Sequence, residues 1–166
     1  MNLTIQIATV NEAAAIARLL NDAADHLTGK FGKGHWSYHT SEKSVVNAIT
    51  GKSKIIIALN GQEIAGSYCL QTKKPWAIDP AFFTPVEQAL YLVGMAVSPA
   101  WQQKGIGRYM MQELPAFITQ WPAQAVRLDA YDHAAGAGDF YRKNGFTERG
   151  RVLYRGNPLI YFERLV

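Results

Sequence analysis

The chain contains one cysteine, Cys69, among its 166 residues. A single thiol excludes an intramolecular disulfide and a multi-thiolate zinc site, so we expect a reducing, cytoplasmic location. Long hydrophobic runs are also absent, and Glu12 and Arg18 interrupt the apolar pattern near the start of the sequence. We therefore expect no secretory signal, no membrane-spanning segment and no membrane partner.

Clustered charge of one sign is missing as well. Lys and Arg total 17 and Asp and Glu 13, which gives a net charge of +4, but the basic residues are scattered along the chain. A nucleic-acid surface concentrates such residues, so we expect no nucleic-acid partner and assign the excess to solubility and a small phosphate site. A basic nucleic-acid-binding domain is the alternative that a steep salt dependence of DNA binding would support.

What is present predicts one α/β domain over residues 1–166. Hydrophobic residues make up 48% of the chain and charged residues 18%, enough for one substantial core, and the sequence has no internal repeat or linker. Asn11 is the expected cap of the first helix, and Pro115 predicts a kink or an early end in the helix that contains it. Apolar periodicity predicts strands over 3–7, 54–59, 62–72, 90–97 and 126–130, a terminal hairpin, and helices over about 16–27, 41–49, 105–119 and 136–144.

The segment from Ala96 to Met111 takes an apolar strand through a turn at Pro99 into a glycine-rich helix start. The first N–H groups of a helix have no helical partner, and the helix dipole adds positive charge there. Gly105 and Gly107 remove side chains that would keep an anion away from the backbone. Lys104 and Arg108 add formal charge, so the segment predicts a site for a pyrophosphate.

Two motifs carry a resemblance to a known family. Gln102-x-x-Gly105-x-Gly107, preceded by Val97-x-Pro99, resembles the acyl-CoA-binding motif of the GCN5-related N-acetyltransferases (GNAT). Ala137-x-x-Phe140-Tyr141-x-x-x-Gly145-Phe146 is similar to the late helix of that family, which places a tyrosine beside the CoA sulfur. The family's asparagine three residues before this alanine is replaced here by Ala134, and Asp132 or His133 is the candidate substitute.

The resemblance implies a GNAT-like α/β (α+β) fold: a mixed, mostly antiparallel sheet of six to seven strands, with helices on both faces and a splayed parallel strand pair. It implies acetyl transfer from acetyl-CoA to a primary amine of a small molecule or peptide by direct attack, and a homodimer through the terminal strands or the aromatic loop. A non-catalytic acyl-CoA-binding or sensing module is the alternative. The implied cofactor-binding residues are Met95, Ala96, Val97, Gln102, Gln103, Lys104, Gly105, Ile106, Gly107, Arg108 and Asp132.

Tyr141 is the implied catalytic residue, as a hydrogen-bond donor to the leaving sulfur. The alternative is a core aromatic, and the choice depends on whether Phe140 or Tyr141 faces the sheet, since neighbours on a helix point about 100° apart. The general base is open among Glu87, Asp129 and His133. An amide near Met95 is the expected donor to the developing oxyanion.

Other sequence patterns indicate a functional site less strongly. Gly51-Lys52-Ser53 lacks the earlier glycine of a P-loop, and Met110 and Tyr141 stand where a dinucleotide fingerprint needs glycine. Cys69 is expected to be a buried structural thiol. The histidines at 26, 35 and 39 lack a carboxylate at ligand spacing, so no metal site is expected. The resemblance implies that one group of residues surrounds the acceptor, with a mobile surface loop as the alternative: Phe31, His35, Trp36, Tyr38 and His39. A second group is expected at the acceptor mouth or at a dimer contact, or else as ordinary loop residues packed on the sheet: Trp76, Phe82 and Phe83.

Overall fold

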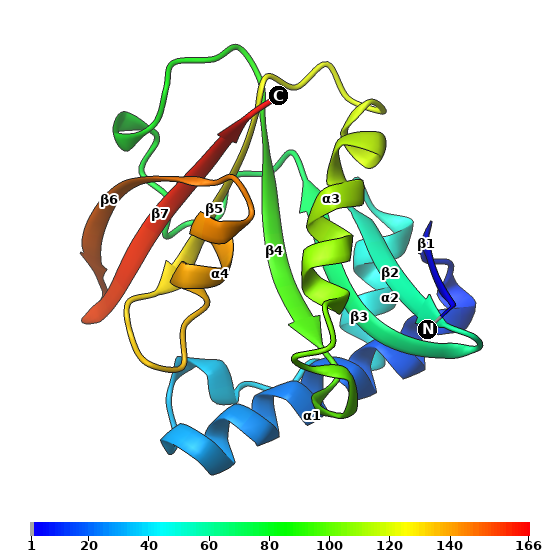
Figure 1. Cartoon of the computed structure of the whole chain (residues 1–166). Helices are drawn as coiled ribbons and strands as arrows, with labels where there is room; N and C mark the ends of the chain where they lie inside the picture. Colours follow the sequence, from blue (N-terminus) through cyan, green and yellow to red (C-terminus); the bar gives the residue numbers. More distant parts are fainter. Residues whose placement is uncertain (1) are drawn as a thin grey trace. The chain divides into compact units, whose positions relative to one another are not determined.

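The computed structural model describes residues 2–166, and its seven strands form one sheet in the order β1-β2-β3-β4-β5-β7-β6 (Figure 1). The neighbours β4 and β5 run parallel, whereas the β1–β2, β2–β3, β5–β7 and β6–β7 pairs are antiparallel. The mixed, mostly antiparallel sheet expected from the sequence is therefore confirmed. The elements are β1 (Leu3–Ile7), α1 (Ala13–Phe31), α2 (Glu42–Thr50), β2 (Lys54–Asn60), β3 (Glu63–Gln71), β4 (Ala89–Val97), α3 (Ile106–Ile118), β5 (Ala125–Tyr131), α4 (Gly138–Lys143), β6 (Thr147–Tyr154) and β7 (Asn157–Leu165).

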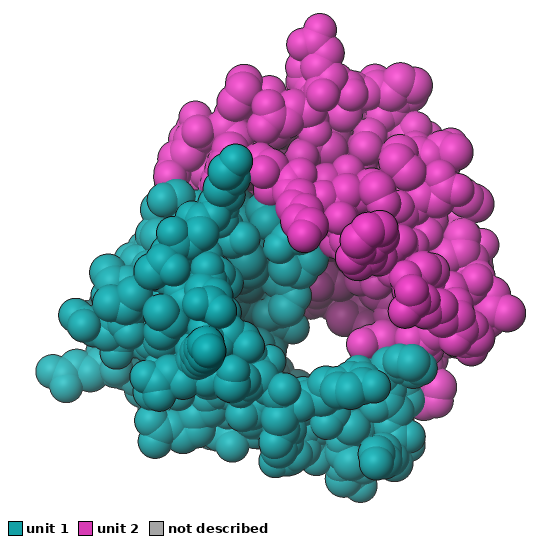
Figure 2. Space-filling model, turned by 180° about the vertical axis from the view of Figure 1, so that it is seen from behind, with its two compact units in different colours: residues 1–71, 93–113 teal, residues 72–92, 114–166 magenta. Residues whose placement is uncertain are grey.

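The residues divide into two compact units, which Figure 2 distinguishes by colour. Unit 1 extends to Gln71 and resumes from Val93 to Glu113, and unit 2 comprises Thr72–Leu92 and Leu114–Val166. The chain passes between units within β4, after Leu92, and within α3, after Glu113. No helix in residues 2–166 is both long and apolar enough to cross a membrane.

In unit 1, helices lie on both faces of the strands β2 and β3. Ile16 of α1 and Val45 of α2 pack in one core with Ile55 and Ile57 of β2. These two isoleucines are two residues apart and therefore point to the same face. The opposite face is covered by α3, whose Met110 lies against Gly66 of β3.

In unit 2, β5, β7 and β6 carry α4 on one face and the proline-containing segment 72–88 on the other. Tyr141 of α4 packs on Phe162 of β7, with ring centroids 5.8 Å apart. The next residue toward the N-terminus, Tyr161, points the other way and contacts Phe83, with ring centroids 5.3 Å apart. Ile78 and Tyr91 complete this second core cluster.

Local signals differ from the sequence expectations in three places. Thr9, not Asn11, caps the first turn, and its side chain and backbone form a capping box with Glu12. Helix α1 continues to Phe31, past the expected end near Leu27. Helix α3 also continues through Pro115 to Ile118, so the proline does not end it early.

Candidate functional site

The predicted pyrophosphate site lies in unit 1, between the end of β4 and the start of α3. We call residues 96–111 the cradle segment and its turn and helix start the cradle. A 3₁₀ turn, Pro99–Trp101, follows the strand and is held by a hydrogen bond from Trp101 N to Ser98 O at 2.8 Å. Gln103 and Gly105 then adopt φ angles of 59° and 83°, in the left-handed region. A Cβ on Gly105 would meet no atom within 4 Å, so the backbone conformation, not lack of space, is what favours glycine here.

The backbone amides after this turn are the ones that could bind an anion. The first amide that donates back to the turn is Tyr109 N, to Gly105 O at 3.0 Å. The amides of Ile106, Gly107 and Arg108 come before this bond, at the positive end of the helix dipole. The Ile106 side chain is 1% exposed, so this residue can contribute to the cradle only through its backbone.

Two cations lie in the cradle segment, and neither joins an ion pair with residues 2–166. Lys104 Nζ donates to Ala100 O at 2.9 Å and lies 4.5 Å from the centroid of the Trp101 ring. Arg108 is exposed. Gln102 Nε2 donates to Val97 O at 3.2 Å, which fastens the turn to the end of β4.

Two glycines that sequence reasoning missed position the cradle. A Cβ on Gly66 of β3 would lie 2.8 Å from Met110 Sδ and 3.3 Å from both Ala96 O and Ile106 Cγ2. Because glycine has no side chain, the start of α3 can pack closely against β3 at Gly66. Gly94, in the middle of β4, adopts φ 61°, which interrupts the regular strand just before Met95.

The parallel pairing of β4 with β5 is short. Its register joins Ala89–Tyr91 with Ala125–Arg127 and extends no further within the described residues. Beyond it, the predicted cofactor-binding residues Met95, Ala96 and Val97 are half-buried. β4 also neighbours β3 in the sheet, but those of its backbone groups that bond to neither strand require other hydrogen-bond partners where they are buried.

The positions of Phe140 and Tyr141 are the reverse of the arrangement that the catalytic interpretation assumed. Tyr141 is 7% exposed and packs edge-on against Phe146, with ring centroids 5.6 Å apart, whereas Phe140 is half-buried. Helix α4 is therefore rotated so that the tyrosine ring, not Phe140, faces the sheet. Burial, and secondarily the negative charge of Asp129, raises the pKa of Tyr141. The hydroxyl therefore stays protonated at neutral pH and can act as a donor.

Asp129 is the candidate base that the structure distinguishes. It is half-buried on β5, burial raises the pKa of its carboxyl, and it forms no ion pair within residues 2–166. Glu87 is exposed, and exposed His133 accepts a hydrogen bond from Ala135 N at its Nδ1. The β5–β7 register pairs Asp129 with Tyr161, which places the carboxylate on the face opposite Tyr141.

Asp132, the proposed substitute for the missing asparagine, is held by an arginine. Both of its carboxylate oxygens accept from Arg151, at 3.1 and 3.0 Å. Arg151 also donates to Glu148, which in turn accepts from Arg142. This charged network borders a hollow of about 500 Å³, which also has Ala134 in its wall.

The proline-containing loop proves to be anchored. Phe83 is 4% exposed and belongs to the core, and the Phe82 ring packs edge-on against Tyr161. The Tyr161 hydroxyl donates to Ala77 O and accepts from Asp79 N. Trp76, in contrast, is 85% exposed.

The segment after α1 is fastened back onto that helix. Asn21 exchanges two hydrogen bonds with the backbone of Thr40, at 2.7 and 3.1 Å. One turn on, Asp25 Oδ1 lies 2.7 Å from His39 Nε2, and a further turn on, the hydroxyls of Thr28 and Ser37 lie 2.6 Å apart. The three helix positions share one face, so the segment runs back along α1. Tyr38 is 78% exposed.

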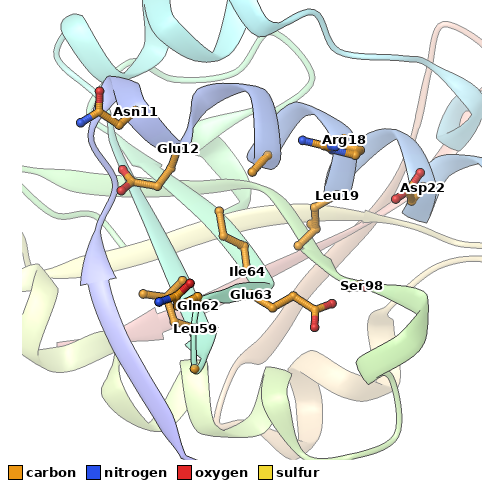
Figure 3. A pocket seen from close by; sticks show the side chains of 12 residues that line it. Asn11, Glu12, Arg18, Leu19, Asp22, Leu59, Gln62, Glu63, Ile64 and Ser98 are labelled. Atoms are coloured by element: carbon orange, nitrogen blue, oxygen red, sulfur yellow. The ribbon is translucent and has the colours of Figure 1, made fainter.

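A second hollow in unit 1, of about 550 Å³, is lined by residues of α1 and of the β2–β3 hairpin. Figure 3 shows the side chains that line it. Arg18 and Asp22 border it from the helix and Glu63 from the hairpin, with Ser98 at the start of the cradle segment. Sequence reasoning did not predict it, because nothing in a linear pattern shows which helix face a hairpin approaches.

The described residues were also considered for a metal site and for a reactive cysteine. Within residues 2–166, no three His, Cys, Asp or Glu side chains are grouped closely enough to hold a metal ion. Cys69 is half-buried, and burial raises the pKa of its thiol, which opposes formation of a thiolate.

Comparison with models of known protein families identifies the family of this chain. The model of the acetyltransferase (GNAT) domain matches residues 51–148, more than half of the chain. No curated protein sequence shows significant similarity. The chain thus belongs to the GNAT acetyltransferase family, and it is an acyltransferase by class.

Solved structures show the same fold at low sequence identity. The chain is similar to yncA from Salmonella typhimurium, solved with its cofactor acetyl-CoA, with a TM-score of 0.74, 15% identity, and 98% and 93% of the two chains covered. It is similar to the paiA N-acetyltransferase from Thermoplasma acidophilum in complex with coenzyme A, with a TM-score of 0.74, 13% identity and full coverage of both chains. It also resembles the ribosomal-protein-S18-alanine N-acetyltransferase from Escherichia coli, with a TM-score of 0.71, 16% identity, and 99% and 94% covered.

Proposed function

We propose that this protein transfers the acetyl group of acetyl-CoA to a primary amine of a small molecule or peptide by direct attack. The observation that carries the proposal is the cradle at the start of α3. It combines Gly105 at φ 83°, free helix-start amides, and two cations that no carboxylate among the described residues neutralises. A pyrophosphate is an anion that uses all three features.

The residues of the cradle have separate roles in this proposal. The amides of Ile106, Gly107 and Arg108 donate to the pyrophosphate, and Gln102 holds the turn against Val97. Gln103 supplies a left-handed backbone position that turns the chain toward the helix. The side chains of Lys104 and Arg108 provide positive charge at the rim.

The end of β4 binds the pantetheine arm in the same way that a strand binds its neighbour. Met95, Ala96 and Val97 lie beyond the short pairing with β5, so their backbone can pair with the amides of the arm. Asp132 is our candidate acceptor for a further pantetheine N–H. Arg151 fixes its carboxylate, and each oxygen retains a second lone pair.

The chemistry requires a base for the amine and a donor for the sulfur. When bound, acetyl-CoA supplies a thioester whose carbonyl carbon accepts the amine and whose thiolate leaves. Asp129 takes a proton from the attacking amine, since its raised pKa makes it a better base than an ordinary aspartate. The Met95 amide donates to the carbonyl oxygen as negative charge develops there.

Tyr141 acts as a hydrogen-bond donor to the departing sulfur. Complete proton transfer from tyrosine to thiolate is uphill, because a thiol has a pKa of about 8.5 and tyrosine about 10. Burial raises the pKa of Tyr141 further, which keeps the donor in its protonated form. Asp129 and Tyr141 lie on opposite faces of the β5–β7 pair, so in this proposal the base and the sulfur donor act from different faces of the sheet.

The binding site of the acceptor amine is proposed only at the level of a chain segment. We propose that the amine binds at the segment that contains Phe31, His35, Trp36, Tyr38 and His39. A homodimer, a cytoplasmic location and a single domain over residues 1–166 stay predictions. The non-catalytic acyl-CoA-binding module is favoured by Ala134, whose side chain cannot hydrogen-bond the pantetheine arm, and by the absence of an acidic residue from Leu90 to Val97.

Release of free thiol from acetyl-CoA in the presence of a panel of amines tests this function. We expect turnover by the wild-type protein, and loss of CoA binding by Gly105→Glu, because its carboxylate would repel the phosphates. Gly156→Glu is the matched control, since Gly156 has φ 79° and equally open surroundings at the β6–β7 turn. CoA binding without thiol release would support the non-catalytic module, and wild-type affinity in Gly105→Glu would contradict the cradle.

A further inference from the structure

We propose that Trp101 is a positioning residue of the donor site, whose indole face holds the Lys104 ammonium at the cradle before an anion binds. The inference rests on the proposed binding of acetyl-CoA. It adds to that site an aromatic side chain that lies outside the glycine motif.

The geometry fixes the lysine from two directions. Lys104 Nζ lies 4.5 Å from the Trp101 ring centroid and donates to Ala100 O at 2.9 Å. Trp101 is itself held in place, because its backbone N–H donates to Ser98 O at 2.8 Å and the residue is half-buried, with the indole Nε1 inside the protein. An ammonium over an indole face is attracted by the negative face of the ring.

Both partners hold the ammonium without cancelling its charge. A carbonyl oxygen and an aromatic ring are neutral, unlike the carboxylate of an ion pair. An ammonium has three N–H donors, and Ala100 uses one, so donors are left for a phosphate. The side-chain entropy that a mobile lysine loses on binding an anion is already lost in the folded protein.

The second cation of the cradle provides an internal comparison. Arg108 is exposed, and none of the cation–ring pairs among residues 2–166 includes it. If the indole acts through Lys104, a change at Trp101 must depend on Lys104 and be independent of Arg108.

The indole edge suggests a conservative variant. Trp101 Nε1 is buried and has no hydrogen-bond partner among the described residues. Trp101→Phe therefore keeps a ring face for the ammonium and breaks no hydrogen bond. Trp101→Leu keeps apolar bulk and removes the face.

Calorimetric titration with CoA at low and high salt tests the proposal. At low salt we expect Trp101→Leu to weaken CoA binding about threefold to tenfold, and Trp101→Phe to keep most of the affinity. In a Lys104→Met background, Trp101→Leu should cause no further loss, whereas in an Arg108→Ala background it should cause its full loss. The effect should shrink at high salt, because exposed charges are screened.

An equal loss from Trp101→Leu with and without Lys104 would overturn the positioning role while leaving the donor site intact. Absence of CoA binding by the wild-type protein would instead overturn the proposed function itself. Should Trp101→Leu fail to fold, Trp101→Ile replaces it. Unchanged low-salt affinity in a folded variant without the ring also contradicts the proposal.

Discussion

Thr84 and Glu163 are 79 residues apart in the sequence, yet the Glu163 carboxylate accepts hydrogen bonds from both the backbone N–H and the hydroxyl of Thr84, at 3.2 and 2.6 Å. The other carboxylate oxygen accepts from Arg127 Nε at 2.9 Å, and Arg127 also donates to Thr84 O at 2.6 Å. Thr84, Arg127 and Glu163 thus form a hydrogen-bond network in which the charged side chains of Arg127 and Glu163 are buried. The loop 72–88 is tied by this network to β5 and β7.

Arg127→Met should destabilise the protein by up to about 3–5 kcal/mol, because the buried Glu163 carboxylate would lose its nearer cation and keep only Arg149 Nε, 3.7 Å away. Burial alone would raise the pKa of Glu163, but the bonds from Thr84 and Arg127 outweigh it and the pKa is lowered. A lowered folded-state pKa means that the stabilisation is full above the unfolded value of about 4.3 and is lost as the pH falls through the folded value. Urea unfolding between pH 3 and 7 measures both effects, and Arg127→Met/Glu163→Leu is expected to be milder than Arg127→Met alone.

Asp129→Asn should lower kcat by about 10²- to 10⁴-fold with amines that are protonated at neutral pH. The loss should be smaller with weakly basic amines, which need no base to remove an ammonium proton. In the wild type, kcat/KM should rise with pH, with a midpoint above the ordinary aspartate value of about 3.9, because burial raises the pKa of Asp129. The same loss for every amine would argue against a base at this position.

The same substitution should raise the thermal midpoint at neutral pH. A carboxyl whose pKa is raised by folding binds its proton more tightly in the native state, so its stabilising effect is present at low pH and is lost as the pH rises through the folded value. Asparagine carries no charge and avoids the desolvation cost. Calorimetric scans at pH 4 and pH 7 should show the larger gain at pH 7, whereas a structural role for the carboxylate predicts a loss at both.

Tyr141→Phe should lower kcat about tenfold to a thousandfold while acetyl-CoA affinity stays nearly unchanged. The ring is retained, so its contacts with Phe146 and Phe162 persist and the thermal midpoint should move little. Steady-state kinetics and a thermal melt on one variant separate catalysis from packing. Phe140→Leu is the control on the same helix, and an unchanged kcat in Tyr141→Phe would leave Tyr141 a core residue only.

Gly66→Ala should destabilise unit 1 by about 1–3 kcal/mol, because the new methyl would meet Met110 Sδ at 2.8 Å and the carbonyl of Ala96 at 3.3 Å. Since the start of α3 would have to move, CoA binding should weaken as well. Gly66→Ala/Met110→Ala makes room for the methyl and should recover part of the affinity. A variant with normal affinity and stability would show that the close approach is not required.

The turn and the helix start that form the proposed cradle were predictable because their requirements are local. Pro99 and the glycines at 105 and 107 mark a turn and a helix start in neighbouring positions, and the structure places them there. Gly66 could not be found in this way, since its requirement comes from Met110, 44 positions further along the chain, packing across the sheet. The orientation of Phe140 and Tyr141 was also beyond the sequence, because both are aromatic and only the packing of α4 decides which one faces β7.

The choice among the three candidate bases depends on their surroundings in the folded protein. The sequence alone does not rank Glu87, Asp129 and His133, and partial burial on β5 distinguishes Asp129 from the two exposed residues. The anchoring of the loop 72–88 was likewise hidden, because Thr84 and Glu163 meet only after β7 has taken its place beside β5.

The hydrogen bonds that fasten the segment 32–41 to α1 bear on how the proposed acceptor site could be redesigned. The conformation of this segment depends partly on residues outside it, because Asn21, Asp25 and Thr28 on one face of α1 hold it by hydrogen bonds. A graft of this segment from a relative must therefore carry those three helix positions with it, or the transplanted residues will lose the template that orders them. None of the three hydrogen-bonded pairs includes a cradle residue, so such a graft leaves the hydrogen bonds of the proposed donor site in place.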